Sequence, residues 1–220
     1  MLSKQTFKFL SDLKKHNDRE WFEKNKKSYE AAQAEIKDFI AEWLKAFSKK
    51  DESLSHLEPK NCLFRIYRDV RFSADKSPYK TNLGAYINKG GKNGNTAGYY
   101  LHIEPGNCFY GAGNYMPTPE QLAKIRQEID YNFSDFNKLI SGKKFKDTFG
   151  DLMQDNKLKK PPKGYDENNP AIEFLKLKGF TIWSKLKDEE VLDKNFIKQI
   201  VKLSEMSQPF IEFLNTAVEE

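Results

Sequence analysis

Four short segments, rich in aromatic and β-branched residues and separated by turn residues, constrain the fold more than any other feature of this sequence. They span residues 62–72, 83–88, 97–104 and 108–113. Each has the length and composition of a β-strand. The Gly- and Asn-rich loop at 89–95 and the Pro-Gly-Asn turn at 105–107 are connections of the hairpin type. Strands joined in this way are expected to form an antiparallel meander.

Helical patterns precede and follow these segments. Apolar residues recur at helical spacing over 3–15 and over 18–48. Thr118, Pro119 and Gln121 have the spacing of a capped helix start with a capping box. Further helices are expected at 132–141, 171–178, 189–206 and 209–217, with one more strand at 180–183. The prediction is an α+β fold, an antiparallel β-sheet meander flanked by N-terminal and C-terminal helices.

The domain organisation expected from this order is a single domain over residues 1–220. It is helical over 1–48, has its sheet core at 62–113 and is helical again over 118–217. A chain of this length buries enough apolar surface to fold without a disulfide or a metal.

The charge balance allows an anionic partner without requiring one. The chain has 37 Lys and Arg against 32 Asp and Glu, a net charge of +5. That is mild compared with a dedicated nucleic-acid coat protein. No apolar run approaches the roughly 20 residues needed to span a bilayer, so no membrane association is expected. The start of the sequence lacks the apolar core of a signal peptide, so the expected location is the cytoplasm.

The two cysteines give no sign of a metal or redox site. Cys62 and Cys108 form no CxxC pair, and no histidine lies at ligand spacing from either. We expect no metal, no cofactor and two inert core thiols. No feature of the sequence indicates an oligomeric state.

Residues 65–80 combine positive charge with ordered spacing. The stretch reads Arg-Ile-Tyr-Arg-Asp-Val-Arg-Phe-Ser-Ala-Asp-Lys-Ser-Pro-Tyr-Lys, with five cations against two carboxylates. Arginine can hold two oxygens of a phosphate or carboxylate at once, because its guanidinium is a planar fork. We therefore expect an anion-binding cleft at one end of the sheet. Its predicted residues are Arg65, Arg68, Arg71, Lys76, Tyr79 and Lys80.

The two carboxylates in this stretch, Asp69 and Asp75, are candidate catalytic residues, as a base or as orienters of the arginines. If 63–72 is a strand, Arg68 lies among apolar neighbours and needs a partner, since a lone buried charge is costly. Two readings compete with the anion site. One is an internal Arg–Asp network that fastens the sheet to the long helix, and the other is an exposed charge run.

This stretch resembles the signature of a bacterial family of conserved hypothetical proteins, the domain of unknown function 2461. The pattern is Arg-x-x-Arg-Asp-x-Arg-Phe, a short gap, then Asp/Asn-Lys-x-x-Tyr. The matching residues are Arg65, Arg68, Asp69, Arg71, Phe72, Asp75, Lys76 and Tyr79. The resemblance extends over nearly the whole chain, through segments near 17–22, 98–100, 111–117 and 162–165. It implies no catalytic residue, because the family has no established activity.

Two further features are candidates for function. His102 lies in an expected strand, shares a face with Tyr100, and is the best histidine for general acid–base catalysis. Tyr110 is expected opposite this pair across the hairpin. Lys157, Lys159, Lys160 and Lys163 form a second basic patch that could extend a surface for nucleic acid.

Three functions of different class therefore remain open. In the first reading, the chain is an enzyme acting on an anionic small molecule that carries phosphate or carboxylate. Alternatively it is a non-catalytic binding module for nucleic acid or an acidic protein. In the third reading the motif at 65–80 serves folding alone. Steep salt dependence would mark nucleic-acid binding, and a deep pocket would favour an enzyme.

Overall fold

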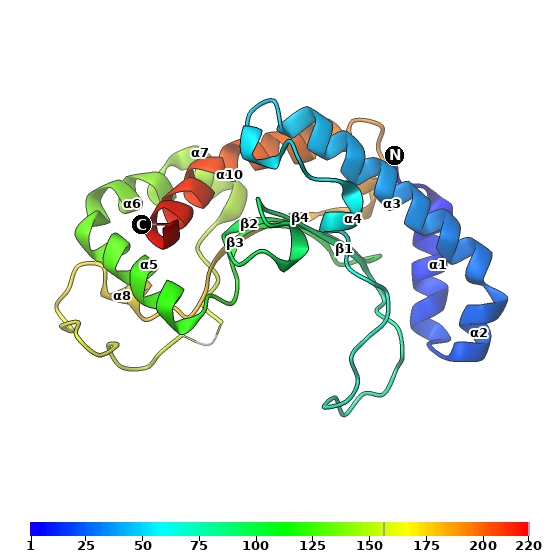
Figure 1. Cartoon of the computed structure of the whole chain (residues 1–220), viewed down its shortest axis with the longest axis horizontal. Helices are drawn as coiled ribbons and strands as arrows, with labels where there is room; N and C mark the ends of the chain where they lie inside the picture. The colour runs from blue at the N-terminus through cyan, green and yellow to red at the C-terminus, as the bar shows by residue number, and fades with distance from the viewer. Residues whose placement is uncertain (156, 220) are drawn as a thin grey trace.

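A four-stranded antiparallel sheet occupies the middle of the computed structural model, which describes residues 1–155 and 157–219. The strands are β1 (Leu83–Ile87), β2 (Gly98–Ile103), β3 (Cys108–Asn114) and β4 (Phe180–Leu186), in this order across the sheet (Figure 1). All neighbouring strands pair antiparallel. The predicted meander is confirmed, and the strand expected at 180–183 pairs with β3 and continues to Leu186.

The strand predicted at 62–72 is wrong. A short helix, α4 (Pro59–Cys62), begins with Pro59 at its first position and a capping box between Glu58 and Asn61. After it the chain forms only isolated bridges, Leu63 with Ala85 and Tyr67 with Tyr79. The backbone N–H groups of Arg68 and Lys80 donate to carbonyls within the same loop. The first residues of the segment, Leu63 and Phe64, therefore pair with β1, whereas the part beyond them pairs with its own return limb.

We call residues 64–82 the arm. Figure 1 shows it leaving the sheet on the side opposite the long helices and folding back to enter β1. Short 3-10 turns lie on either side of β1 in the sequence, at Glu52–Leu54 and Gly91–Asn93.

The N-terminal helices are α1 (Lys4–Lys15), α2 (Arg19–Lys24) and α3 (Lys26–Phe47). The single helix expected over 18–48 is therefore divided at Asn25. The Asn25 side chain donates to the Trp21 carbonyl at 2.8 Å, and its backbone leaves the helical region with φ −107° and ψ 15°. An asparagine amide competes with the helical ladder in this way. Asp18 caps α2, its carboxylate accepting a hydrogen bond from Trp21 N.

The C-terminal half is helical except for β4. Its helices are α5 (Pro119–Tyr131), α6 (Phe133–Ser141), α7 (Lys143–Phe149), α8 (Ile172–Leu175), α9 (Asp188–Val191) and α10 (Phe196–Glu219). The capping box at the start of α5 is present, whereas α7 was not expected.

The two C-terminal helices predicted at 189–206 and 209–217 are in fact the short α9 and one continuous helix, α10, with Pro209 inside it. An interior proline costs a helix about 3 kcal/mol. Around Pro209, α10 buries Phe210, Ile211 and Leu214, each worth about 1.5–3 kcal/mol when removed from water. Packing outweighs the local penalty, so the helix does not end.

Helices α3 and α10 lie over one face of the sheet (Figure 1). Leu101, Ile103 and Tyr110 point into this layer and are buried. Polar contacts cross the same layer: Trp43 Nε1 donates to Ser204 Oγ at 3.0 Å, and the Tyr110 hydroxyl lies 2.7 Å from Ser207 Oγ. None of the described helices is both long and apolar enough to cross a membrane.

Candidate functional site

The face of the sheet turned away from α3 and α10 carries partly exposed aromatic side chains. Side chains alternate between the two faces along each strand, and the register pairs His102 with Phe109 and Gly111 with Tyr100 and Trp183. The four rings, Tyr100 and His102 on β2, Phe109 on β3 and Trp183 on β4, therefore share this open face. Trp183 is 45% exposed, an unusual state for a large ring in the middle of a strand.

The sequence prediction placed Tyr110 near this pair, and that is wrong. Tyr110 pairs with Leu101 and points into the core on the other face. The neighbour across the hairpin is Phe109, because side chains alternate between faces along a strand.

The rings on the open face form a continuous strip that begins at the base of the arm. We call these five residues the aromatic strip: Phe64, Tyr100, His102, Phe109 and Trp183. Ring centroids are 6.3 Å apart for Phe64 and Tyr100, 5.6 Å for Tyr100 and Phe109, and 6.4 Å for Phe109 and Trp183. His102 stacks on Phe109 at 4.7 Å. The strip therefore crosses the sheet from the arm to β4.

Cations lie at both ends of the aromatic strip. Lys80 Nζ lies 5.2 Å from the centre of the Phe64 ring, and Lys185 is next to Phe109 in the β3–β4 register. Burial, and then the charge of Arg65, lower the pKa of Lys80 below its ordinary value. In residues 1–155 and 157–219, Arg65, Lys80 and Lys185 have no carboxylate oxygen within 4.0 Å. An anion at either end would relieve this uncompensated charge.

The tip of the arm holds the other predicted cations, and there the chain supplies their partners. Arg68 pairs with Asp75 and also donates to the Ser77 carbonyl at 3.2 Å and to Ser73 Oγ at 3.3 Å. Hydrogen bonds from Ser77, and then Arg68, lower the pKa of Asp75 to about 2. The contacts of Arg68 and Asp75 therefore hold the tip of the arm together.

Arg71 and Lys76 are similarly occupied. Arg71 donates two hydrogen bonds to the Asp69 carboxylate, from Nε at 2.9 Å and from Nη2 at 2.7 Å. Lys76 Nζ donates to the Val70 carbonyl at 3.0 Å. Both cations remain exposed to solvent. Phe72, next to Arg71, is 97% exposed, so the tip presents an aromatic ring with no covering side chain.

The six predicted anion-binding residues therefore do not form one cluster. Tyr79 is buried and stacks on Phe22 with centroids 3.9 Å apart, which fastens the arm to α2. Arg68, Arg71 and Lys76 lie in the tip with partners of their own, while Arg65 and Lys80 lie at the base beside the sheet. The anion site stays a prediction, and its unmatched cations are at the base.

His102 belongs to a chain of polar contacts along β2. The Tyr100 hydroxyl lies 2.9 Å from His102 Nδ1, and His102 Nε2 lies 3.5 Å from Glu104 Oε2. Burial lowers the pKa of His102, and the nearby Glu104 opposes this only in part. Burial and Glu104 raise the pKa of Tyr100 to about 12. At neutral pH a neutral phenol lies against a neutral imidazole, whose Nε2 is close to Glu104 but buried without a hydrogen-bond partner. A hydroxyl in contact with an imidazole can exchange a proton with it.

Metal binding has no candidate in the part of the chain that the structure describes, where no three His, Cys, Asp or Glu side chains are grouped to hold an ion. Cys62 and Cys108 are both buried free thiols. The second basic patch predicted from sequence is partly neutralised, since Lys157 Nζ lies 2.6 Å from Glu173.

Sequence reasoning missed Phe64, Phe109, Trp183 and Lys185 as site residues. Trp183 does fall on the polar phase of its strand, with Thr181 and Lys185, and a large ring in that phase is a signal of a functional face.

The family model for the conserved hypothetical protein DUF2461 matches residues 5–213, a span that contains the arm and the whole aromatic strip. The chain belongs to the DUF2461 family. No curated protein and no solved structure matches it significantly. The description of DUF2461 states no activity, so the function of this site is argued from its geometry.

Proposed function

We propose that the aromatic strip and the arm bind single-stranded nucleic acid, and that the protein acts as a binding module. The observation that carries the proposal is the continuous line of rings on an open sheet face, with cations lacking carboxylate partners at both ends. Unpaired bases stack on aromatic side chains, and cations hold the phosphates between them.

The dimensions of the strip suit a short run of bases. Four strands about 4.8 Å apart span roughly 14 Å, room for two or three stacked bases of the kind that sheet-based RNA-binding domains hold. Arg65 and Lys80 at one end, with Lys185 at the other, are placed to meet phosphates. Phe72 at the tip of the arm is an additional exposed ring for a base or sugar beyond the strip.

Openness favours binding over catalysis. A reaction site normally encloses its substrate, since water exclusion strengthens every polar contact inside it. The rings at the two ends of the strip are exposed instead, Phe64 by 39% and Trp183 by 45%. A polymer that covers the face is a better match to this surface than a small molecule.

The test is fluorescence anisotropy with a labelled ten-nucleotide single strand over a salt series. If three cations contact phosphates, log Kd should change with log salt by a slope of about 2, because each contact on a single strand contributes about 0.7. The triple variant Arg65→Gln/Lys80→Gln/Lys185→Gln should flatten this slope and weaken binding at least tenfold.

A matched control removes the same amount of charge from α3 and α10, the helices on the opposite side of the sheet from the aromatic strip. Lys27, Lys45 and Lys202 are exposed on α3 and α10, and changing these three to Gln should leave the slope nearly unaltered. Equal loss in both triple variants would mean a diffuse charge effect and no site. Absence of binding to the wild-type protein in low salt would refute the proposal.

A second candidate is acid–base catalysis on a small anion, favoured by the contacts that join Tyr100, His102 and Glu104. Here Lys80 would hold the anion while the Tyr100 hydroxyl, backed by His102, exchanges a proton with it. Inorganic phosphate titrated into the protein should then shift the NMR signals of the His102 ring. Unchanged signals at saturating phosphate, with oligonucleotide binding intact, exclude this candidate.

A further inference from the structure

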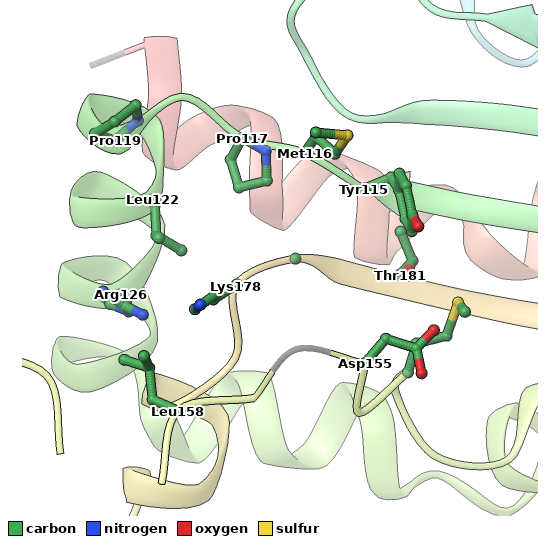
Figure 2. A pocket seen from close by; sticks show the side chains of 12 residues that line it. Tyr115, Met116, Pro117, Pro119, Leu122, Arg126, Asp155, Leu158, Lys178 and Thr181 are labelled. Atoms are coloured by element: carbon green, nitrogen blue, oxygen red, sulfur yellow. The ribbon is translucent and has the colours of Figure 1, made fainter. Parts of the chain in front are cut away.

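A cavity separate from the aromatic strip lies between α5, the segment that follows β3 and the start of β4 (Figure 2). Its volume is about 550 Å³, within the 300–1,000 Å³ typical of small-molecule sites. None of the five rings of the strip and no residue of the arm lines it. The cavity is therefore lined by residues other than those of the proposed nucleic-acid surface.

Two cations face each other across the cavity. Figure 2 shows the side chains of Arg126, from α5, and Lys178, from the segment before β4, reaching toward one another. In residues 1–155 and 157–219 neither has a carboxylate oxygen within 4.0 Å. Two like charges that converge without an acid between them repel, and a bound anion would reverse the sign of that interaction.

Arg126 is only partly satisfied by the protein. One of its terminal nitrogens, Nη2, donates to the Leu177 carbonyl at 3.0 Å, which orients the guanidinium. Its Nε is buried and has no partner. Burial lowers the pKa of Arg126 below its ordinary value. A buried donor without an acceptor is costly, so this guanidinium is held ready for a group that can accept from it.

The remaining walls are mostly apolar. Pro117 and Leu122 lie on one side of the two cations and Leu158 on the other, with Met116 nearby (Figure 2). Met116 is 81% exposed, and flexible methionine side chains adapt to apolar ligands. Asp155 is the acidic residue of the lining and lies beyond Lys178, near Thr181 (Figure 2).

We infer that this cavity binds a small organic monoanion, a carboxylate with an apolar body. The carboxylate lies between Arg126 and Lys178, where the planar guanidinium can offer two hydrogen bonds. The apolar body packs on Leu122, Pro117 and Leu158. Asp155 rejects a ligand with a second carboxylate at its other end, because two like charges would then meet without a counterion.

The experiment measures binding of octanoate by calorimetry and by the rise in the thermal unfolding midpoint. Three compounds of the same chain length serve as controls. Octanol carries no charge, octylamine one positive charge and octanedioate two negative charges. Octanoate should bind and raise the midpoint, while each of the other three should bind at least tenfold more weakly. Octanol or octylamine binding as tightly as octanoate would overturn the inference.

Variants locate the site. Arg126→Gln and Lys178→Gln should each weaken octanoate binding at least tenfold. The exposed position of Lys178 keeps that variant informative even if Arg126→Gln is unstable. Lys124→Gln removes a cation from the same helix outside the cavity and should bind octanoate as the wild type does. No response of the wild type to octanoate, or equal loss in Lys124→Gln, would refute the assignment.

Discussion

Two glycines of β3 should respond in opposite ways to the same substitution. Gly113 has φ +128°, and a Cβ placed on it would lie 2.0 Å from the Phe180 carbonyl oxygen and 2.9 Å from Thr181 Cα. Gly111, two residues earlier, is not among the glycines with positive φ. A Cβ there would meet nothing nearer than the Ile182 carbonyl oxygen at 3.6 Å, an ordinary contact.

The expected magnitudes follow from these contacts. Alanine at the Gly113 conformation costs about 1–3 kcal/mol in backbone strain, and displacing β4 backbone to admit the methyl group costs about 1–3 kcal/mol more. The free energy of unfolding should fall by roughly 4 kcal/mol, which lowers the melting temperature of a chain this long by about 8–16 °C. Gly111→Ala should instead raise stability by about 0.4–1 kcal/mol, because it restricts the unfolded chain.

The assay is thermal and urea unfolding of Gly113→Ala, Gly111→Ala and the wild type, followed by circular dichroism. The wild-type values and Gly111→Ala serve as the matched reference within one strand. If Gly113→Ala melts within about 2 °C of Gly111→Ala, the close approach of β3 and β4 is not what sets this position, and the reasoning fails. The pairing also matters for the proposed binding surface, because β4 carries Trp183 and Lys185.

Three further outcomes are expected. Because burial lowers the pKa of His102, the unfolded chain takes up its proton first as pH falls below about 6.5, so stability falls on acidification. Urea midpoints at pH 5.5 and 7.5 should differ less in His102→Gln than in the wild type, and an equal difference would contradict this. Tyr110→Phe removes the hydroxyl that contacts Ser207 and should lower the free energy of unfolding by about 1 kcal/mol in urea titration. An unchanged free energy would show that this buried hydrogen bond does not stabilise the fold. Burial raises the pKa of Cys62 to about 11 and of Cys108 to about 12, so a thiol reagent at pH 8 should react quickly only after denaturation, and fast labelling of the native protein would show that these thiols are accessible.

The parts of the fold that were predictable are those in which local pattern and final contacts agree. The strands at 83–88, 97–104 and 108–113 are bounded by turn residues on both sides, and the structure pairs them as a meander. The segment at 62–72 has the same composition but is not a strand of the sheet, because only Leu63 and Phe64 pair with β1 and the part beyond them pairs with the return limb of its own loop. Composition indicates the preference of a segment for extended backbone and does not specify which other segment it pairs with.

The candidate site likewise has some features that the sequence predicts and others that depend on the tertiary structure. Charge and spacing marked residues 65–80, and the face shared by Tyr100 and His102 followed from the alternation of a strand. The separation of Arg68 and Arg71, which have their own carboxylates, from Arg65 and Lys80, which have none, depends on how the arm folds back. The place of Trp183 on this face depends on β4, which follows β3 only after α5, α6, α7, a long loop and α8.

The sequence by itself determined the α+β class, most of the helices and strands, and the family to which the chain belongs, because periodicity, caps and turn residues act over a few positions. Tertiary structure decided which face of the sheet stays open, which cations lack a carboxylate partner, and where Arg126 meets Lys178. Those features require segments distant in the chain to meet. Their pairing is set by the packing of the whole core, which no local pattern records.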